Sequence, residues 1–327
     1  MTVPYSPEIE ELPDTAVGVL VTAEAVAQDA IAEQLTTALL TLWTSFSLFY
    51  TEAAVLAFGA RAARLVRTAQ RRTGGISEQH LRRQFRRLDV PVPDQPMVDL
   101  PEDLRLGADT EDVYQRPIRK LRYLVAEGMA EEEAKLVAAE RIEKQALTDL
   151  QNAKVTAAQQ LYYVTNPNLI VGYRRIIHPE LGSVCGLCIA ASDRMYYRIE
   201  KMELHPACRC TTLPVIEIDG QTVDPGRALN VADLAAIYAA AGNTTDSRAL
   251  SRTRIQVREN GELGPILMAD GAEYKGPQQV KQQLSSAAAE RRLASIQAQL
   301  AKLRAIENPN EWYTDRIAQL EELADAA

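Results

Sequence analysis

Cysteine is scarce in this chain of 327 residues: it occurs four times, and all four positions lie between Cys185 and Cys210. A small secreted domain held together by disulfides would have more cysteines, spread along the whole chain. The absence of cysteine elsewhere therefore excludes a disulfide framework as the basis of the fold. The confined cluster instead indicates a single local site.

Histidine occurs only at His80, His178 and His205. The sequence has no H-E-x-x-H motif and no G-x-S-x-G, Walker A or dinucleotide-binding glycine motif. His178 and Glu180 precede Cys185 as in zinc deaminases, but the four intervening residues leave no room for the required helix and strand. Ser183 or Ser192 could act as a nucleophile beside His178, but no third partner is indicated. We therefore predict that the protein is not an enzyme.

Basic residues are absent from the first 14 positions, so this segment lacks the charged start of a signal peptide. The longest uncharged run, residues 34–51, could span a bilayer by length, but seven of its residues are Ser or Thr. Apolar side chains from Leu35 to Ala63 recur at alternating steps of four and three, as in a helix that packs along partner helices. We predict such a helix, with no membrane contact. The net charge of −8 also argues against bulk attraction to DNA or to an anionic membrane.

The chain divides into four regions by composition and pattern. Residues 1–90 are expected to form an N-terminal helical docking region with a basic arm, and residues 91–115 a proline-rich connector. Residues 116–227 combine a helical stretch with a cysteine and histidine module, and residues 228–327 end in a helical hairpin. The predicted fold is mainly α: long helices at both ends surround a small α+β central module with a metal-type knob and a short β-hairpin.

Local signals predict the helices of the first half. One long helix, or two in line, is expected over residues 22–72, ended by Gly74 and Gly75. A further helix follows over residues 77–88, and a helical pattern resumes over residues 116–163.

In the second half, Asp219 and Gly220 lie between two β-like runs and predict a hairpin over residues 215–223. An Ala-rich helix is expected over residues 228–241, and short strands within residues 251–276. An Asn-Pro-Asn turn at residues 308–310 predicts that the last two helices fold back on each other.

The cysteine segment has the spacing of a zinc site. Cys185 and Cys188 form C-x2-C, whose thiolates can reach one ion from a single turn, and His205 and Cys208 repeat that spacing after 16 residues. Cys210 is a fifth candidate for four positions, so Cys208 and Cys210 could exchange roles. Because thiolate and imidazole ligands favour zinc, we predict one structural Zn²⁺ per chain. Two disulfides, or buried thiols without a metal, are the alternatives.

Positive charge gathers in one stretch of the acidic chain. Residues 61–87 contain nine arginines and one acidic residue, so this stretch carries +8 and the remainder −16. The first four recur every three or four residues, which places them on one helical face. The face either contacts DNA or an acidic protein surface, or is a solvated face paired within the chain. The arginines are Arg61, Arg64, Arg67, Arg71, Arg72, Arg82, Arg83, Arg86 and Arg87.

Several sequence phrases, spread over roughly residues 147–280, resemble the phage Mu F-like minor head protein family in its actinobacteriophage form. The combination of C-x2-C with H-P-x-C-x-C is more specific than any one phrase. The phrases are Gly172-Tyr173-Arg174-Arg175, Cys185-Gly-Leu-Cys188, Ala191 through Tyr196, His205-Pro-Ala-Cys208-Arg-Cys210, Leu213-Pro214-Val215 and Gly261 through Pro265.

The resemblance implies a structural minor capsid protein of a tailed phage. Such a protein is made in the host cytoplasm, lies inside the virion head near the portal vertex, and supports head assembly and DNA packaging or ejection. The implied partners are the portal protein, scaffold or major capsid protein, and packaged double-stranded DNA, while the helical seam could join sibling copies. A zinc-ribbon nucleic-acid-binding protein acting outside the particle is the alternative. A phage maturation protease or zinc hydrolase is a less favoured third class.

Overall fold

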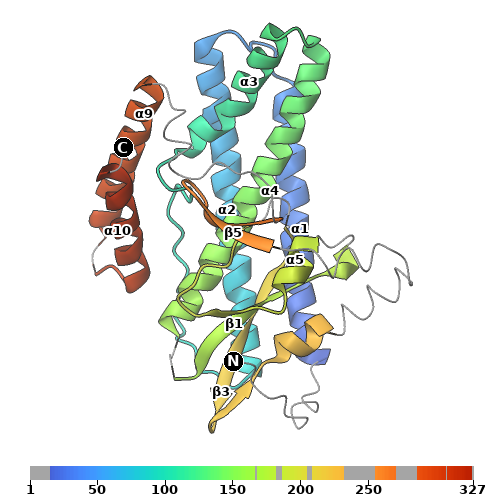
Figure 1. Ribbon diagram of the computed structural model, residues 1–327, viewed down its shortest axis with the longest axis vertical. Coiled ribbons are helices and arrows are strands. Elements are labelled where there is room, and N and C mark those ends of the chain that lie inside the picture. The colour runs from blue at the N-terminus through green and yellow to red at the C-terminus, as the bar shows by residue number, and fades with distance from the viewer. Residues whose placement is uncertain are drawn as a thin grey trace.

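The structure is a computed structural model, which describes residues 15–165, 168–181, 186–204, 208–231, 255–269, 286–306 and 308–325. It is mainly helical, with a small antiparallel sheet and a cysteine cluster, which confirms the predicted fold class. Long helices run along the molecule and the sheet lies against one side of them (Figure 1). The predicted helix at residues 228–241 is described only as far as Val231.

Four helices form the main body. They are α1 (Thr15–Thr44), α2 (Glu52–Arg87), α3 (Thr110–Ala126) and α4 (Glu131–Val164). Hydrogen bonds from Gln28 to Ser77 and from Arg72 to Gln34 show that α1 and α2 run antiparallel. Apolar side chains from all four helices share one buried core, which includes Leu39, Phe58, Leu121 and Ile142.

The prediction of a continuous or in-line helix over residues 22–72 is wrong, because the chain reverses between Thr44 and Glu52. Trp43, Phe46, Phe49 and Phe58 pack their rings against one another at this turn, with centroids 5.1–5.8 Å apart. Buried residues of the heptad seam therefore pack against helices of the same chain. In the described part of the chain, no helix has the length and apolar character needed to cross a bilayer.

The predicted helix end at Gly74 and Gly75 is also wrong, since α2 continues through both residues to Arg87. Gly74 lies against the connector: a Cβ at this position would come within 2.7 Å of the Leu100 side chain. The glycine therefore allows a close tertiary contact. In the sequence, a glycine needed for such a contact looks the same as one that ends a helix. Gly128, with φ at +94°, follows α3 and separates it from α4.

The sheet has the antiparallel order β2-β1-β3-β4, formed by β1 (Ile170–Ile176), β2 (Met195–Tyr197), β3 (Thr211–Ile218) and β4 (Gln221–Val223). The predicted hairpin is confirmed: Asp219 and Gly220, with φ of 51° and 77°, join β3 to β4. Positive φ at both turn residues matches the twist of a two-residue hairpin. A short 3-10 turn, η2 (Pro179–Leu181), and the helix α5 (Gly186–Ala191) lie between β1 and β2.

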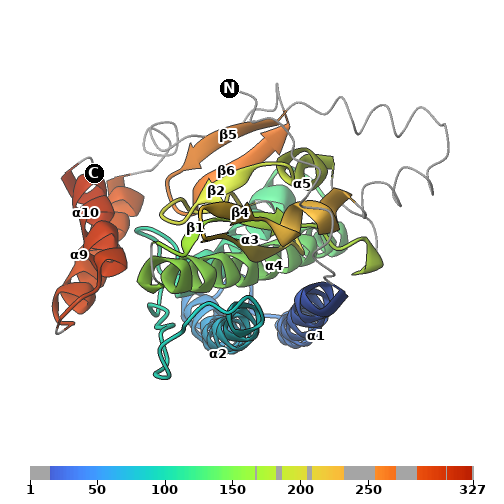
Figure 2. The ribbon, with the colours of Figure 1, turned by 90° about the horizontal axis from the view of Figure 1, so that it is seen from below.

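Two further hairpins complete the described chain. Strands β5 (Ile255–Asn260) and β6 (Gly264–Ala269) confirm the short strands predicted within residues 251–276, and the structure pairs them antiparallel. The helices α9 (Ser286–Arg304) and α10 (Glu311–Asp325) form the predicted helical hairpin, which lies beside the main body (Figure 2). It is fixed to the connector, where Arg316 donates to the carbonyl oxygens of Asp103 and Leu104.

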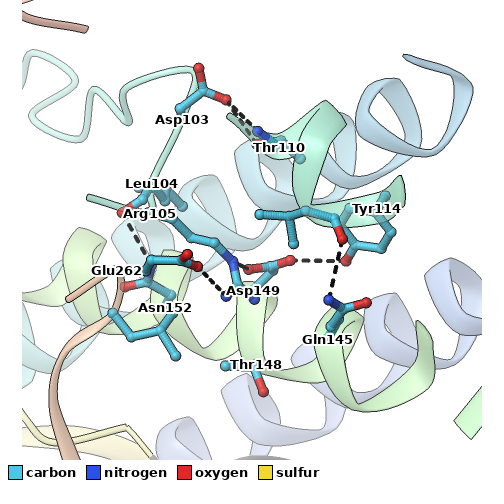
Figure 3. Close-up of polar contacts among 12 residues, drawn as sticks. Asp103, Leu104, Arg105, Thr110, Tyr114, Gln145, Thr148, Asp149, Asn152 and Glu262 are labelled. Atoms are coloured by element: carbon cyan, nitrogen blue, oxygen red, sulfur yellow. Dashed lines mark hydrogen bonds and ion pairs between the residues drawn. The ribbon is translucent and has the colours of Figure 1, made fainter. Parts of the chain in front are cut away.

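A buried polar network around Asp149 joins these parts (Figure 3). The Asp149 carboxylate accepts hydrogen bonds from Arg105 Nε at 2.7 Å and from the Tyr114 hydroxyl at 2.9 Å. Glu262, in the β5–β6 turn, accepts two hydrogen bonds from Arg116 and lies 3.5 Å from Arg105 Nη1. This network therefore links four parts of the chain: the connector, α3, α4 and the β5–β6 hairpin.

Candidate metal centre and arginine face

Three of the predicted ligands, Cys188, Cys208 and Cys210, lie together. Their sulfur atoms are all within 4.8 Å of one another, and the three side chains are buried. Cys188 belongs to α5, while Cys208 and Cys210 directly precede β3. The other two predicted ligands, Cys185 and His205, lie outside the described residues.

Hydrogen bonds from α4 hold the backbone that carries the later two cysteines. Gln151 Nε2 donates to the carbonyl oxygen of Cys210 at 3.4 Å, and Lys154 Nζ donates to that of Arg209 at 3.5 Å. The amide nitrogen of Cys210 donates to Cys208 Sγ at 3.4 Å. A donor directed at sulfur favours the thiolate, which is the form that binds metals.

Arg175 of β1 places a positive charge beside the cluster. Its side chain is completely buried, and Nη1 lies 3.6 Å from Cys208 Sγ. Hydrogen bonds with Cys188 and Cys210, together with Arg175, hold the pKa of the Cys208 thiol well below its usual range. A hydrogen bond with Cys188 acts to lower the pKa of Cys210, but the Cys208 thiolate and burial outweigh it and raise that pKa to about 12. One thiolate is therefore favoured in this pair, whereas burial and the first negative charge disfavour a second.

The three sulfur atoms fit a metal ion. Cys188 Sγ and Cys208 Sγ are 3.5 Å apart, whereas a disulfide bond measures about 2.05 Å, so these two cysteines do not form a disulfide with each other. An ion with about 2.3 Å bonds to sulfur has tetrahedral ligands about 3.8 Å apart. The three buried cysteines are thus close enough to bind one ion, and thiolates select soft or borderline metals over magnesium or calcium.

A cavity of about 290 Å³ between α1, α4 and the cysteine segment reaches the cluster. All three cysteines line it, together with Gln28, Lys154 and His178. Asp29 of α1 and Arg209 also line it, and their side chains form an ion pair at 3.1 Å. The cavity beside the thiols is therefore lined in part by polar and charged side chains.

His178 also lines this cavity, although its role was not identified from the sequence. Its Nδ1 lies 2.7 Å from Glu180 Oε1 and its Nε2 lies 2.7 Å from Thr211 Oγ1, so both ring nitrogens have partners. Burial lowers the pKa of His178. Ser192 instead donates to the carbonyl oxygen of Ile189, and Ser183 lies outside the described residues. His178 thus connects η2 to β3.

The structure divides the nine arginines into two groups. Arg67 is largely buried and lies within 4.0 Å of four acidic side chains, of which Asp103 is nearest at 3.0 Å. Arg82 pairs with Glu78 at 2.7 Å and donates to the carbonyl oxygens of Pro93 and Gln95. These two arginines hold the connector against α2. They fit the alternative in which the arginines pair within the chain.

The remaining seven arginines are exposed on α2: Arg61, Arg64, Arg71, Arg72, Arg83, Arg86 and Arg87. Within the described residues, none of the seven has an acidic side chain within 4.0 Å. The side chains of Arg71 and Arg72 donate instead to the neutral Thr68 and Gln34. We refer to these seven residues as the arginine face.

No protein-family model matches the chain, and neither curated proteins nor solved structures show significant similarity to it.

Proposed function

We propose that the protein is a structural minor capsid protein of a tailed phage, located inside the head at or near the portal. In this role it supports head assembly and the packaging or ejection of DNA. Its partners would be the portal protein, and also scaffold or major capsid protein. It would be assembled in the host cytoplasm and would have no catalytic activity.

The observation that carries this proposal is the convergence of the phrases on which the family resemblance rests. Residues 172–175 form part of β1, which pairs with β3 at Leu213 and with β2 at Met195. Cys208 and Cys210 directly precede β3, and Cys188 of α5 lies beside them. The phrase at residues 261–265 reaches the same module, because Leu204 donates to the carbonyl oxygen of Pro265. The described parts of these phrases, spread over more than 90 residues, thus form one folded unit.

The proposal is tested in the particle itself. Purified virions should contain the protein in a few copies, and an asymmetric reconstruction should place it inside the head at the portal vertex. Co-expressed portal protein should retain it on an affinity column. Absence from virions combined with failure to bind the portal would refute the proposal.

A structural zinc ion is the finer proposal for the cysteine cluster. Cys188, Cys208 and Cys210 would hold it, and either Cys185 or His205 would supply a fourth ligand by its spacing. The ion would link α5 to the start of β3 and neutralise thiolates that burial otherwise disfavours. This cross-link would stabilise the contact between α5 and the start of β3, where the local buried cluster consists of Ile177 and the three cysteines.

Elemental analysis of the purified chain should give one zinc per molecule. Cys188→Ser and Cys208→Ser should each lower the zinc content to well under half and lower the melting temperature, because a tetrahedral site loses a ligand. Ser192→Ala, beside α5, is the matched control and should retain zinc. Intact thiols with no zinc in the wild-type protein would contradict the assignment.

The arginine face favours a second candidate, a zinc-containing nucleic-acid-binding protein that acts outside the particle. Free protein in infected cells, bound to DNA and absent from virions, would support it. The third class, a maturation protease or zinc hydrolase, would be recognised by loss of protein processing in a mutant phage.

A further inference from the structure

The arginine face has the dimensions of an extended binding surface. Residues 61–87 span about 39 Å of α2 at a rise of 1.5 Å per residue, which is close to one turn of double-stranded DNA. Figure 2 shows α1 and α2 on the side of α4 that faces away from the sheet, so this side of the body is not covered by the sheet. The surface is therefore long, and its seven arginines are exposed along it.

The charge of this face is not balanced locally. The only acidic residue of α2 between Arg61 and Arg87 is Glu78, which already binds Arg82 and accepts from the amides of Met97 and Val98. Among the described residues, the seven guanidinium groups of the arginine face thus have no acidic side chain within 4.0 Å, on a chain of net charge −8. An anionic ligand would therefore bind at this face.

The residues between these arginines indicate whether the ligand of the face is a polyanion or another protein. Thr68, Gly75 and Gln79 are exposed between the arginines, and Leu65 is the one large apolar side chain there, 37% exposed. A protein interface usually has an apolar or aromatic centre, which this face lacks. Guanidinium forks bind phosphate oxygens bidentately, and DNA presents one phosphate charge per about 1.7 Å of axis.

We propose that the arginine face of α2 binds the phosphate backbone of double-stranded DNA without sequence preference. Arg67 and Arg82 are not part of this surface, because they hold the connector. This proposal rests on the proposed capsid function, and it identifies the surface that would contact the packaged DNA. It predicts contact along the backbone rather than insertion into a groove.

The experiment measures binding of the full chain to a mixed-sequence 30-base-pair duplex by fluorescence anisotropy between 50 and 200 mM NaCl. If all seven arginines contact phosphates, the logarithm of the binding constant should fall with a slope of about −6 against the logarithm of salt concentration. The affinity should then drop by about 10³-fold or more over this range. The triple variant Arg83→Gln/Arg86→Gln/Arg87→Gln should make the slope shallower by about 3.

The matched control removes the same charge elsewhere. Lys144→Gln/Arg227→Gln/Arg304→Gln changes three exposed cations outside α2 and should leave the slope unchanged. Circular dichroism melting of both variants establishes that they are folded. An equal effect of the two triple variants, or no wild-type binding at 50 mM salt, would overturn the inference.

Virions carrying the α2 triple variant separate this inference from the capsid function. If the protein binds DNA normally in solution but is lost from particles, the arginine face contacts an acidic protein and the DNA assignment is wrong. If DNA binding is lost while the protein remains in the particles, both the capsid function and the DNA contact are supported.

Discussion

Glu24 is a buried acidic residue in the helical body. It is 2% exposed on α1, and Gln84 Nε2 of α2 donates to its carboxylate at 3.3 Å. Burial raises the pKa of Glu24 to about 7, although Lys154 and hydrogen bonds with Ser77 and Gln84 act to lower it. The side chain is therefore accommodated best in its protonated, neutral form.

This pKa makes stability depend on pH. Between pH 4.5, the usual pKa, and about 7, the folded state keeps a proton that the unfolded state releases, so stability falls as pH rises. The expected loss is about 3 kcal/mol from burial of the charged form. Glu24→Gln should remove the loss, so its free energy of unfolding should exceed that of wild type at pH 8 and match it at pH 4.

Urea unfolding at both pH values measures this difference. Glu33→Gln, at an exposed position on the same helix, is the control and should follow wild type at both pH values. A Glu24→Gln variant that is less stable than wild type at pH 8 would show that the carboxylate is instead required in its charged form.

The cysteine cluster shows which residues of a site can be predicted from a local sequence motif. The spacing of Cys188, Cys208 and Cys210 along the chain was sufficient to predict that they meet. No local pattern marks Arg175 as part of the site, because its place beside Cys208 depends on strand pairing. It pairs with Thr212, two residues after Cys210, in the register of β1 and β3. That register follows from burial across the sheet, which a local motif does not contain.

At the scale of the elements, two glycines of α2 provide a matched comparison. Gly59 lies against α3, where a Cβ would come within 2.7 Å of the Glu111 carbonyl oxygen, whereas Gly75 has open space around it. Gly75→Ala should raise the free energy of unfolding by up to about 1 kcal/mol through helix propensity. Gly59→Ala should lower it by about 1–3 kcal/mol, because backbone atoms of α3 must move.

Thermal and urea unfolding of both variants check this contrast, and each variant serves as the control for the other. Stabilisation by Gly59→Ala would mean that α2 and α3 are not packed as closely as described. The comparison also explains the wrong helix boundary at residues 74–75. Glycine in a helix can mark an end or a close contact, and the sequence pattern is the same for both.

The sequence predicts the turns of hairpins better than the course of long helices, for a related reason. The β3–β4 turn and the turn before α10 depend on residues within a few positions, such as Gly220 and Pro309. The reversal between α1 and α2 depends instead on Trp43 and Phe58, which meet only after the helices have folded back. A heptad seam indicates that a helix has partners, but it does not identify them.

At the scale of the whole molecule, distant regions of the chain share contacts that no local pattern indicates. The body core draws on residues from α1 and α2 as well as α3 and α4, so the predicted regions 1–90 and 116–227 pack against each other. Arg105 and Glu262, 157 positions apart, meet in the Asp149 network. Such contacts require the complete fold, because each charge has several potential partners in the sequence.

Glu262 therefore links the β5–β6 hairpin to the helical body. Its carboxylate accepts hydrogen bonds from Nη1 and Nη2 of Arg116, both at 2.9 Å, and its carbonyl oxygen accepts from the Leu106 amide at 2.6 Å. Glu262→Gln should retain the backbone contact but lose the charge, and should destabilise the protein by about 2 kcal/mol. Arg105 keeps Asp149 as a partner, so the loss should remain local to the hairpin.

Hydrogen exchange followed by mass spectrometry distinguishes local from global loss. In the Glu262→Gln variant, amides of residues 255–269 should exchange faster, while those of residues 142–160 in α4 should keep their protection, because sub-global opening needs less free energy than global unfolding. Glu217→Gln, on the exposed end of β3, is the control and should leave both regions unchanged. Equal acceleration in α4 would mean that the hairpin and the helical body unfold as one unit, with Glu262 contributing to the whole structure.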